Sequence, residues 1–260
     1  MDAMAGDERD RLISASARNQ ADWHDASLRA LGVRTSRTGG LWSREPTAPS
    51  IYLRAMTLCP VREAPQIAAE IGRLVESDPG APIVMWDSFG ELDLAPLGLS
   101  RAPWTGQWWA KAATTRTDEP RVEGLEIERV TDRAGLEAFG VATADGFESD
   151  AALRAGGALA WHDPETLADP RMRYFVGRLD GRVVTSSIAY VGRDVVGIYG
   201  VSTLPEFRRR GFGKAITWAA ATVAPKLDVI LAPDEMARGI DAELGFSKLA
   251  EFAPWTRQPS

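Results

Sequence analysis

The sequence has very few of the side chains that cross-link proteins or bind transition metals. It contains one cysteine, Cys59, and two histidines, His24 and His162, among 260 residues. A single cysteine excludes an internal disulfide, and these three residues form no Cys/His cluster for zinc. We therefore expect neither a disulfide nor a metal site.

Long apolar runs and an excess of positive charge are also absent. No stretch has the length of a membrane span, and the first twenty residues are charged and polar, unlike a signal peptide. The net charge of −6 argues against general affinity for nucleic acid. The composition is ordinary for a soluble protein of two domains or one large one. We expect a cytoplasmic protein with no membrane or nucleic-acid partner, and a homodimer is compatible with the sequence.

Arginine and glycine, by contrast, are concentrated in one short stretch, Arg208 to Gly213. An apolar, β-branched run at 195–201 predicts a buried strand before it, and apolar residues at helical spacing from Ile216 to Val223 predict a helix after it. Glycine permits backbone angles that other residues avoid and lets a ligand approach the main chain. Because the first amides of a helix lack partners and carry the positive end of its dipole, the stretch predicts a phosphate or pyrophosphate site.

Two common phosphate loops do not fit this stretch. Lys214 is followed by Ala215, which excludes a Walker A loop, and no third glycine stands at 216 for a dinucleotide fingerprint. The stretch resembles the R/Q-x-x-G-x-G/A loop of the acetyl-CoA-dependent acyltransferases of the GNAT superfamily, with Arg208, Gly211 and Gly213 in the defining positions. The alternative is an ordinary basic helix start on a solvated surface.

The resemblance implies that acetyl-CoA is the cosubstrate. In that family the loop amides hold the pyrophosphate of coenzyme A, and the preceding strand hydrogen-bonds its pantetheine arm. The residues expected to contact it here are Val201, Thr203, Arg208, Arg209, Arg210, Gly211, Phe212, Gly213 and Lys214.

The order of predicted elements across 124–256 is also that of GNAT domains, β-α-α-β-β-β-α-β-α-β. The strands are expected at 125–130, 174–179, 182–191, 195–201, 227–231 and 246–255, and the helices at 131–146, 151–161, 211–224 and 236–244. The resemblance therefore implies an α/β (α+β) fold with a mixed, mostly antiparallel sheet flanked by helices.

The first half contains a faint repeat of the second, over residues 36–113. A constant shift of 147 positions places Ile51-Tyr52 on Ile198-Tyr199 and Leu97-Gly98-Leu99 on Leu244-Gly245-Phe246. We therefore expect two GNAT-like lobes, a degenerate domain at 1–120 and an acetyl-CoA-binding domain at 121–260, with the linker at 114–121. The first half is expected to begin with a largely helical stretch at 1–35, to break at 37–40, and to continue with strands at 41–44, 51–58, 82–86 and 107–113 and a helix at 63–77.

The repeat fails at the phosphate loop. The positions of Arg208, Gly211 and Gly213 become Val61, Ala64 and Gln66, so no glycine remains there, and Pro65 removes one amide donor. We expect the first half to have the fold without the phosphate site, and one coenzyme to bind per chain.

The general acid departs from the family pattern. GNAT enzymes often protonate the departing thiolate with a tyrosine four residues before the last helix's glycine, and that position before Gly245 is Asp241. An aspartate of ordinary pKa, about 3.9, is ionised and cannot donate. Asp241 could act if burial raised its pKa, or could anchor a cationic substrate, but a solvent-exposed helix residue is the expected interpretation. Tyr199 is a second candidate, with a core strand tyrosine as the ordinary alternative.

The general base is chosen from the polar stretch after the first helix of the second half. Glu148 is our catalytic candidate beside Asp241, with Asp145 near it, and His162 could titrate near neutrality. Proton loss through water to bulk solvent needs none of them. Three tryptophans, at 104, 108 and 109, could pack between the halves or line an apolar pocket.

Two functions remain open. The first is an N-acetyltransferase that moves an acetyl group to an amine of a small molecule or peptide, by direct attack and a tetrahedral intermediate. Backbone amides near a bulge at Gly200 would stabilise the developing oxyanion, although a bulge without a catalytic role is equally compatible. The second is a non-catalytic acyl-CoA-binding or assembly protein in which Asp241 marks lost catalysis.

Overall fold

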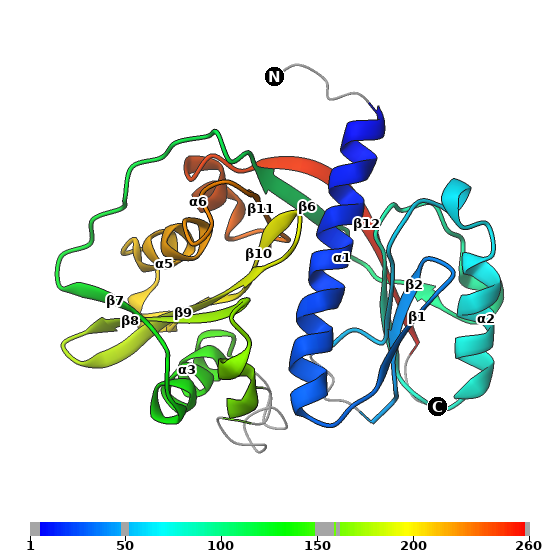
Figure 1. Ribbon diagram of the computed structural model, residues 1–260, viewed down its shortest axis with the longest axis horizontal. Coiled ribbons are helices and arrows are strands. Elements are labelled where there is room, and N and C mark those ends of the chain that lie inside the picture. Colours follow the sequence, from blue (N-terminus) through cyan, green and yellow to red (C-terminus); the bar gives the residue numbers. More distant parts are fainter. Residues whose placement is uncertain (1–5, 48–51, 149–158, 160–161, 258–260) are drawn as a thin grey trace. The chain divides into compact units, whose positions relative to one another are not determined.

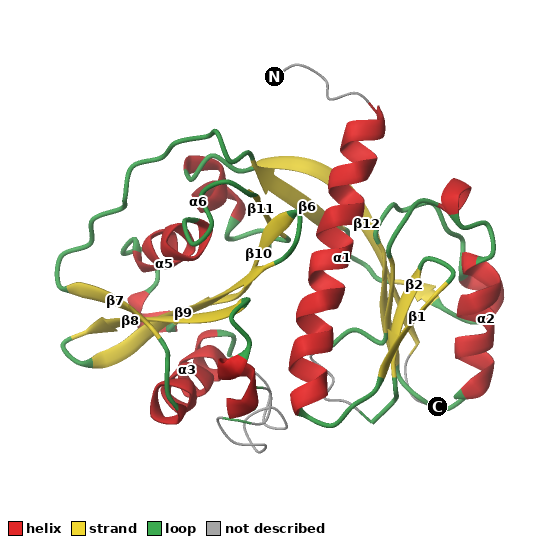
Figure 2. Ribbon diagram, viewed as in Figure 1, coloured by secondary structure: helices red, strands yellow, loops and turns green. Residues whose placement is uncertain are grey.

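The chain folds into two compact units. The computed structural model describes residues 6–47, 52–148, 159 and 162–257 (Figure 1). Unit 1 comprises Met1–Trp109, Ala232–Asp234 and Lys248–Ser260, and unit 2 comprises Ala110–Leu231 and Glu235–Ser247. Both combine helices with a sheet that is mostly antiparallel, so the predicted mixed α/β class is confirmed (Figure 2).

Unit 1 is built on a short twisted sheet. Strands β1 and β2 form a hairpin, β3 is antiparallel to β2, and β4 is parallel to β3. Its helices and strands are α1 (Gly6–Ala30), β1 (Thr35–Thr38), β2 (Leu41–Arg44), β3 (Ala55–Thr57), η1 (Val61–Glu63), α2 (Ile67–Ser77), β4 (Ile83–Asp87), η2 (Ala95–Leu97), β5 (Ser100–Arg101), β6 (Gly106–Lys111), which runs on into unit 2, and β12 (Ser247–Arg257).

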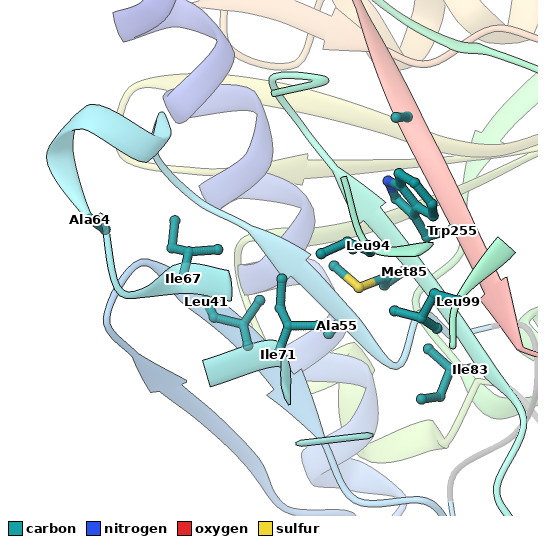
Figure 3. Packing of buried hydrophobic residues seen from close by; sticks show 11 residues of the cluster. Leu41, Ala55, Ala64, Ile67, Ile71, Ile83, Met85, Leu94, Leu99 and Trp255 are labelled. Atoms are coloured by element: carbon teal, nitrogen blue, oxygen red, sulfur yellow. The ribbon is translucent and has the colours of Figure 1, made fainter. Parts of the chain in front are cut away.

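The core of unit 1 lies between α2 and this sheet. Ile67 and Ile71, one helical turn apart, are fully buried on α2. They belong to one buried cluster with Leu41, Ala55 and other apolar residues of the strands (Figure 3). Burying an aliphatic side chain of this size contributes about 1.5–3 kcal/mol, so the cluster fixes α2 against the strands that precede and follow it.

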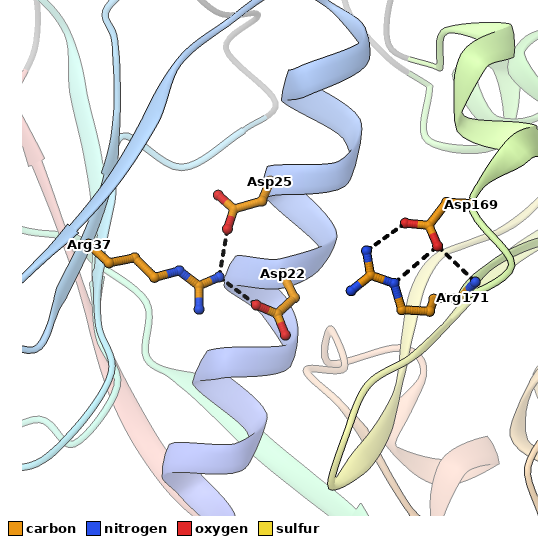
Figure 4. A network of polar contacts seen from close by, with 5 residues as sticks. All are labelled: Asp22, Asp25, Arg37, Asp169 and Arg171. Atoms are coloured by element: carbon orange, nitrogen blue, oxygen red, sulfur yellow. Dashed lines mark hydrogen bonds and ion pairs between the residues drawn. The ribbon is translucent and has the colours of Figure 1, made fainter.

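Each unit contains ion pairs near its surface, and they connect residues of the same unit. In unit 1, Arg37 of β1 donates to the carboxylates of Asp22 and Asp25 on α1, and the indole of Trp42 donates to Asp25 at 2.6 Å (Figure 4). In unit 2, the backbone N–H and guanidinium of one arginine close a turn on the carboxylate two residues before it, in the pair Asp169 and Arg171. Pairs this exposed are worth about 0–1 kcal/mol each.

The last strand joins unit 1, whereas the predicted second domain, 121–260, included it. β12 is antiparallel to β4, with Ala253 opposite Asp87 and Arg257 opposite Ile83. Trp255 belongs to the core cluster of unit 1. The apolar residues of 246–255 predict a strand correctly, but they do not specify its neighbour. β3 pairs with one edge of β4, and β12 pairs with the other edge.

Unit 2 has a larger sheet in the order β11-β10-β9-β8-β7, in which only β10 and β11 are parallel. Helix α3 covers one face of the sheet, and α5 and α6 cover the other (Figure 2). The elements are β7 (Leu125–Arg129), α3 (Arg133–Gly146), η3 (Pro164–Ala168), β8 (Met172–Leu179), β9 (Arg182–Val191), β10 (Val195–Thr203), η4 (Pro205–Phe207), α5 (Phe212–Ala221), β11 (Asp228–Leu231) and α6 (Arg238–Glu243).

The two units repeat one connection order. The run β1-β2-β3-α2-β4 has the same antiparallel and parallel pairings as β8-β9-β10-α5-β11. The single shift of 147 does not extend through the hairpins, whose glycine turns at 39–40 and 180–181 lie 141 positions apart. The units therefore share a topology, with a small difference in loop length.

Three local predictions need correction or fall outside the structure. Residues 37–40 do not simply break the chain: they end β1 and turn into β2, with Gly39 and Gly40 at φ 55° and 84°. The helix predicted at 63–77 begins only at Ile67, after the separate 3₁₀ turn η1. The helix predicted at 151–161 lies outside the described residues. In the part of the chain that the structure describes, no helix combines the length and apolar character needed to cross a membrane.

Candidate active site

The strand β10 is irregular where the sequence predicts contact with a ligand. Gly200 and Val201 stand opposite the single residue Ser187 of β9, which makes a bulge, and Gly200 has φ 59°. On its other edge, the parallel ladder with β11 covers Val195 to Gly197 and stops there. The two parallel strands thus pair at one end only, and the backbone of β10 around the bulge leaves the ladder.

The loop after β10 needs glycine at one position for the backbone itself. Arg209 and Gly211 both have left-handed backbone angles, with φ 61° and 86°. A β-carbon at Gly211 would also lie 3.2 Å from Cγ2 of Val122. A left-handed residue other than glycine costs about 1–2 kcal/mol, so both strain and contact favour glycine at 211.

Six consecutive amides in this loop are free. Within the described ranges, the N–H groups of residues 209–214 donate no hydrogen bond, whereas those of Arg208 and Ala215 on either side bond to Pro205 O and Gly211 O. Residues 212–214 are also the first turn of α5, where the helix dipole is positive. An array of this kind is suited to an anion with several oxygens.

Gly213 leaves space beside these amides. A β-carbon there would meet only Oγ1 of Thr203, at an ordinary 3.5 Å, so protein packing does not demand glycine. The absence of a side chain at Gly213 therefore leaves room for a ligand at the start of α5.

The side chain of Arg208 points away from the free amides. Its guanidinium donates to Gly146 O at 2.7 Å, to the Glu148 carboxylate at 2.9 Å and to Thr203 O at 3.3 Å. It therefore ties the loop to the end of α3 and to β10. The sequence pattern located this arginine but gave no sign that it acts as a strut.

The other predicted contact residues surround the loop in different ways. Arg210 lies over the rings of Phe207 and Phe212, at 5.3 and 5.0 Å from their centroids, and Arg209 is exposed. Lys214 pairs with Glu243 at 2.7 Å. Of these cations, only Arg209 is exposed and makes no contact with a neighbouring side chain in the described part of the chain, so the amides rather than the arginines dominate the site.

A row of buried hydroxyls lies beneath the bulge and was missed at the sequence level. Ser186 Oγ is 2.9 Å from Thr143 Oγ1 and 2.7 Å from Ser202 Oγ, and Thr203 Oγ1 is 3.0 Å from Thr185 Oγ1. These bonds join α3, β9 and β10 on the side of the bulge that leads into the loop. The run Thr185-Ser186-Ser187 in an otherwise apolar strand was the signal that could have revealed them.

Residues 141–246 match the sequence model described as the acetyltransferase (GNAT) family. The matched segment is a GNAT acetyltransferase domain. The matched segment runs from α3 through the bulge and the free amides to the turn after α6. A search of curated proteins found no match to the chain.

Solved structures share the fold over nearly the whole chain. A GCN5-related N-acetyltransferase from Kribbella flavida aligns with a TM-score of 0.63 and 18% identity, over 93% of this chain and 96% of that one. A putative GNAT acetyltransferase from Novosphingobium aromaticivorans gives 0.58 and 15%, over 94% and 97%. A tandem GNAT protein from the clavulanic acid biosynthesis pathway gives 0.59 and 16%, over 95% and 96%. At these identities the likeness shows the fold alone.

Asp241 is not the exposed helix residue that we expected. It is 4% exposed, in the short helix α6 of the GNAT domain. Its backbone carbonyl accepts from the amides of Leu244 and Phe246, both of which are buried. Asp241 lies inside α6, whose C-cap is Leu244, and composition alone does not reveal which face of so short a helix is buried.

The candidate bases of the GNAT domain differ sharply in environment. Glu148 is largely exposed, and its carboxylate is paired with Arg208 at 2.9 Å. Asp145 is exposed one turn earlier. His162 is buried against Phe139 and Tyr174, and burial lowers its pKa to about 4, so the prediction that it titrates near neutrality is wrong. Tyr199 is 8% exposed, in line with a core strand tyrosine.

The tryptophans near the end of the first half do not act as one cluster. Trp108 is fully buried in unit 1, where its ring packs on Trp86 and Phe252 and its indole N–H donates to Ser88 O at 3.3 Å. Trp104 is 51% exposed, and Trp109 is half-buried. Trp108 is therefore a core residue of unit 1.

In the corresponding loop of unit 1, three amides already have acceptors within the protein. The N–H of Val61 donates to the carboxylate of Glu91 at 2.7 Å, and those of Glu63 and Ala64 donate to Pro60 O and Val61 O. Pro65 has no N–H to offer. An anion is thus already present at this loop, and it belongs to the protein.

Proposed function

We propose that the GNAT domain binds acetyl-CoA and transfers its acetyl group to an amine of a small molecule or a peptide. The observation that carries this proposal is the row of free amides at 209–214, at the start of α5 and next to the bulged strand β10. The family generally uses an acyl-CoA cosubstrate. The amides would hold its pyrophosphate, and the backbone of β10 near Val201 and Thr203 would bind the pantetheine arm.

The fit of the site to a bound acyl-CoA is steric as well as electrostatic. Gly213 keeps the entrance to α5 clear, and Gly211 permits the turn that aligns the amides. When bound, acetyl-CoA supplies an acetyl thioester. The backbone N–H groups at the bulge of Gly200 and Val201 would then stabilise negative charge on the carbonyl oxygen of a tetrahedral intermediate.

Proton transfer from the amine is assigned to water in this proposal. The carboxylate of Glu148 is engaged by Arg208, and His162 is buried with a lowered pKa of about 4. An attacking amine with a pKa of about 10 must lose its proton first. An exposed route to bulk solvent serves this purpose without a dedicated side chain, whereas Glu148 could serve only after Arg208 releases it.

Asp241 is the proposed source of the proton for the departing thiolate. It holds the position at which GNAT enzymes often have a tyrosine, and it is 4% exposed. The matched test is Asp241→Asn, which keeps the shape and removes the ionisable group. We expect a loss of at least tenfold in kcat with an unchanged Kd for acetyl-CoA, and an unchanged kcat would remove Asp241 from the mechanism.

The second candidate is a protein that binds acyl-CoA without turning it over, favoured by the same replacement of tyrosine by Asp241. Thiol release from acetyl-CoA with a panel of small amines and N-terminal peptides distinguishes the two. Release that depends on one class of amine supports the acetyltransferase. Saturable binding of acetyl-CoA with no release by any amine supports the second candidate.

A further inference from the structure

A pocket of about 300 Å³ opens at one end of the sheet of unit 1. It is lined by residues from β1, the end of β2, the residue before β3 and the last turns of α2. It therefore lies at the amino end of β3, whereas the loop that corresponds to the phosphate loop follows the carboxyl end of that strand. The pocket is built from residues of unit 1 alone, whereas every residue in the proposed function belongs to unit 2.

The lining of the pocket carries an excess of positive charge. Three arginines, Arg34, Arg44 and Arg54, face it together with one acid, Glu45. Arg34 pairs with Glu45 at 2.6 Å, which leaves two arginines without a carboxylate of their own. Both of these are buried, since Arg44 is 7% exposed and Arg54 is 5% exposed.

Arg44 is satisfied by backbone atoms alone. Its guanidinium donates to the carbonyl oxygens of Leu53, Tyr52 and Glu45, at 3.0, 2.9 and 2.7 Å. Burial and the charge of Arg54 lower the pKa of Arg44 to about 10, so it remains cationic at neutral pH. Its hydrogen bonds fix its position and leave its charge uncompensated.

Arg54 lines the same pocket with its hydrogen bonds unmade. Its guanidinium has no hydrogen bond and no ion pair within 4 Å among the residues that the structure describes. Burial is the main cause that lowers its pKa, and the charges of Asp78, Arg257 and Glu45 act on it from beyond ion-pair distance. A guanidinium cannot neutralise itself by losing a proton at ordinary pH, so burying it unpaired is costly.

We propose that this pocket binds a small anion through a carboxylate or phosphate group, with Arg54 as its principal ligand. The planar fork of a guanidinium matches both groups. The hydroxyls of Ser36 and Ser43, 3.0 Å apart at the pocket wall, supply further donors. The volume is at the small end of the range for ligand pockets, which suits a compact acid and excludes a whole coenzyme A.

The test is thermal unfolding of the full chain, with saturating coenzyme A to occupy the loop at 209–214, titrated with inorganic phosphate, acetate or succinate, against sodium chloride at matched ionic strength. We expect a saturable rise in Tm with at least one of the oxyanions and none with chloride, and the stronger response tells phosphate from carboxylate. Arg54→Gln should raise the oxyanion concentration that gives half of the rise in Tm at least tenfold. The control Arg73→Gln, on the exposed side of α2, should leave it unchanged. Equal responses to oxyanions and chloride, or an undiminished response in Arg54→Gln, would overturn the proposal.

A second variant decides the matter if Arg54→Gln does not fold. Ser43→Glu keeps Arg54 and places a carboxylate of the protein in the pocket. We expect this variant to unfold at or above the wild-type temperature and to lose the oxyanion response, while its affinity for acetyl-CoA stays unchanged. A wild-type oxyanion response in Ser43→Glu would contradict the assignment, whatever the outcome for acetyl-CoA.

Discussion

The loop after β3 in unit 1 and the loop after β10 in unit 2 occupy the same position in the same order of elements, but their amides have different partners. In unit 2, residues 209–214 have six N–H groups without an acceptor in the described structure. In unit 1, the amide of Val61 is bonded to the carboxylate of Glu91, those of Glu63 and Ala64 are bonded to backbone carbonyls, and Pro65 has no N–H. The loop of unit 1 therefore has no continuous run of unbonded donors, whereas the loop of unit 2 has six in a row.

The difference between the two loops separates the topology, which the fold requires, from the unbonded amides, which it does not require. A strand, a turn and a helix form in both units, so the topology does not depend on free amides. Unit 1 replaces the glycines with Ala64 and Gln66, and it brings its own anion in Glu91. The fold itself does not require six consecutive unbonded donors, since unit 1 forms the same strand, turn and helix without them. An anion with several oxygens would satisfy these donors in unit 2.

The comparison extends to one buried histidine in each unit, which gives the largest expected effect on stability. Burial lowers the pKa of His24 in unit 1 to about 3 and that of His162 in unit 2 to about 4. Both folded-state values are below the unfolded value of 6.5, so the stabilising neutral form is fully favoured above pH 6.5 and is lost as the pH falls toward 4 or 3.

We expect His162→Phe to remove part of this acid sensitivity. Urea unfolding at pH 7 and pH 4.5 should show that the wild type loses on the order of 2 kcal/mol more than the variant, since one pKa unit is worth about 1.36 kcal/mol. His24→Phe serves as the matched variant in unit 1. An equal pH dependence in the wild type and both variants would show that neither histidine is neutral in the folded state.

Substituting Gly211 attacks the open loop directly. Gly211→Val introduces a β-carbon near Val122 and a residue that disfavours φ 86°. We expect acetyl-CoA affinity to fall at least tenfold, or about 1.4 kcal/mol, by calorimetry. Gly181→Val is the control, because Gly181 has φ 79° in the β8-β9 turn with nothing within 4 Å of its β-carbon position. Unchanged affinity in a folded Gly211→Val protein would refute the phosphate-loop assignment.

Removing the carboxylate of Glu91 tests whether this internal anion is what keeps the loop of unit 1 from binding a coenzyme. Glu91→Gln weakens the bond to the Val61 amide and should lower the free energy of unfolding by about 1 kcal/mol. It should not create a second coenzyme site, because Pro65 and the side chain of Ala64 remain. Chemical denaturation gives the first result and an acetyl-CoA titration the second, and a new site in this variant would mean that Glu91 alone closes the loop.

The smallest expected effect concerns the pair between Arg208 and Glu148. The carboxylate is largely exposed, so Glu148→Gln should change stability by less than about 1 kcal/mol. If water takes the amine proton, the kcat of Glu148→Gln should stay within threefold of the wild-type kcat at each pH from 6 to 9 in steady-state assays. A loss of a hundredfold that is restored at high pH would instead identify Glu148 as the base.

The sequence predicted the elements that depend on local spacing. The apolar run of β10, the glycines at 211 and 213 and the helical repeat of α5 are all encoded within a few residues, and they appear where expected. The hairpin of β8 and β9 follows from the Asp180-Gly181 turn in the same way. Local backbone chemistry was sufficient for these features.

Features that depend on distant partners were not predictable. The register of β12 against β4 needs a free edge in another part of the chain. The burial of Asp241 depends on how α6 packs, and the direction of Arg208 depends on carbonyl and carboxylate groups about 60 residues earlier. A single sequence shows the residue types at these places, but it does not show which atoms they meet.

Titration of acetyl-CoA into the full chain by calorimetry tests the division between the two loops most directly. The account predicts one site per chain, with the stoichiometry near one and binding lost when the loop at 208–213 is replaced. The same replacement at 61–66 should leave both affinity and stoichiometry unchanged, because the amides of Val61, Glu63 and Ala64 are bonded within the protein and Pro65 has none to offer. Two sites per chain, or binding that survives replacement of 208–213, would contradict it.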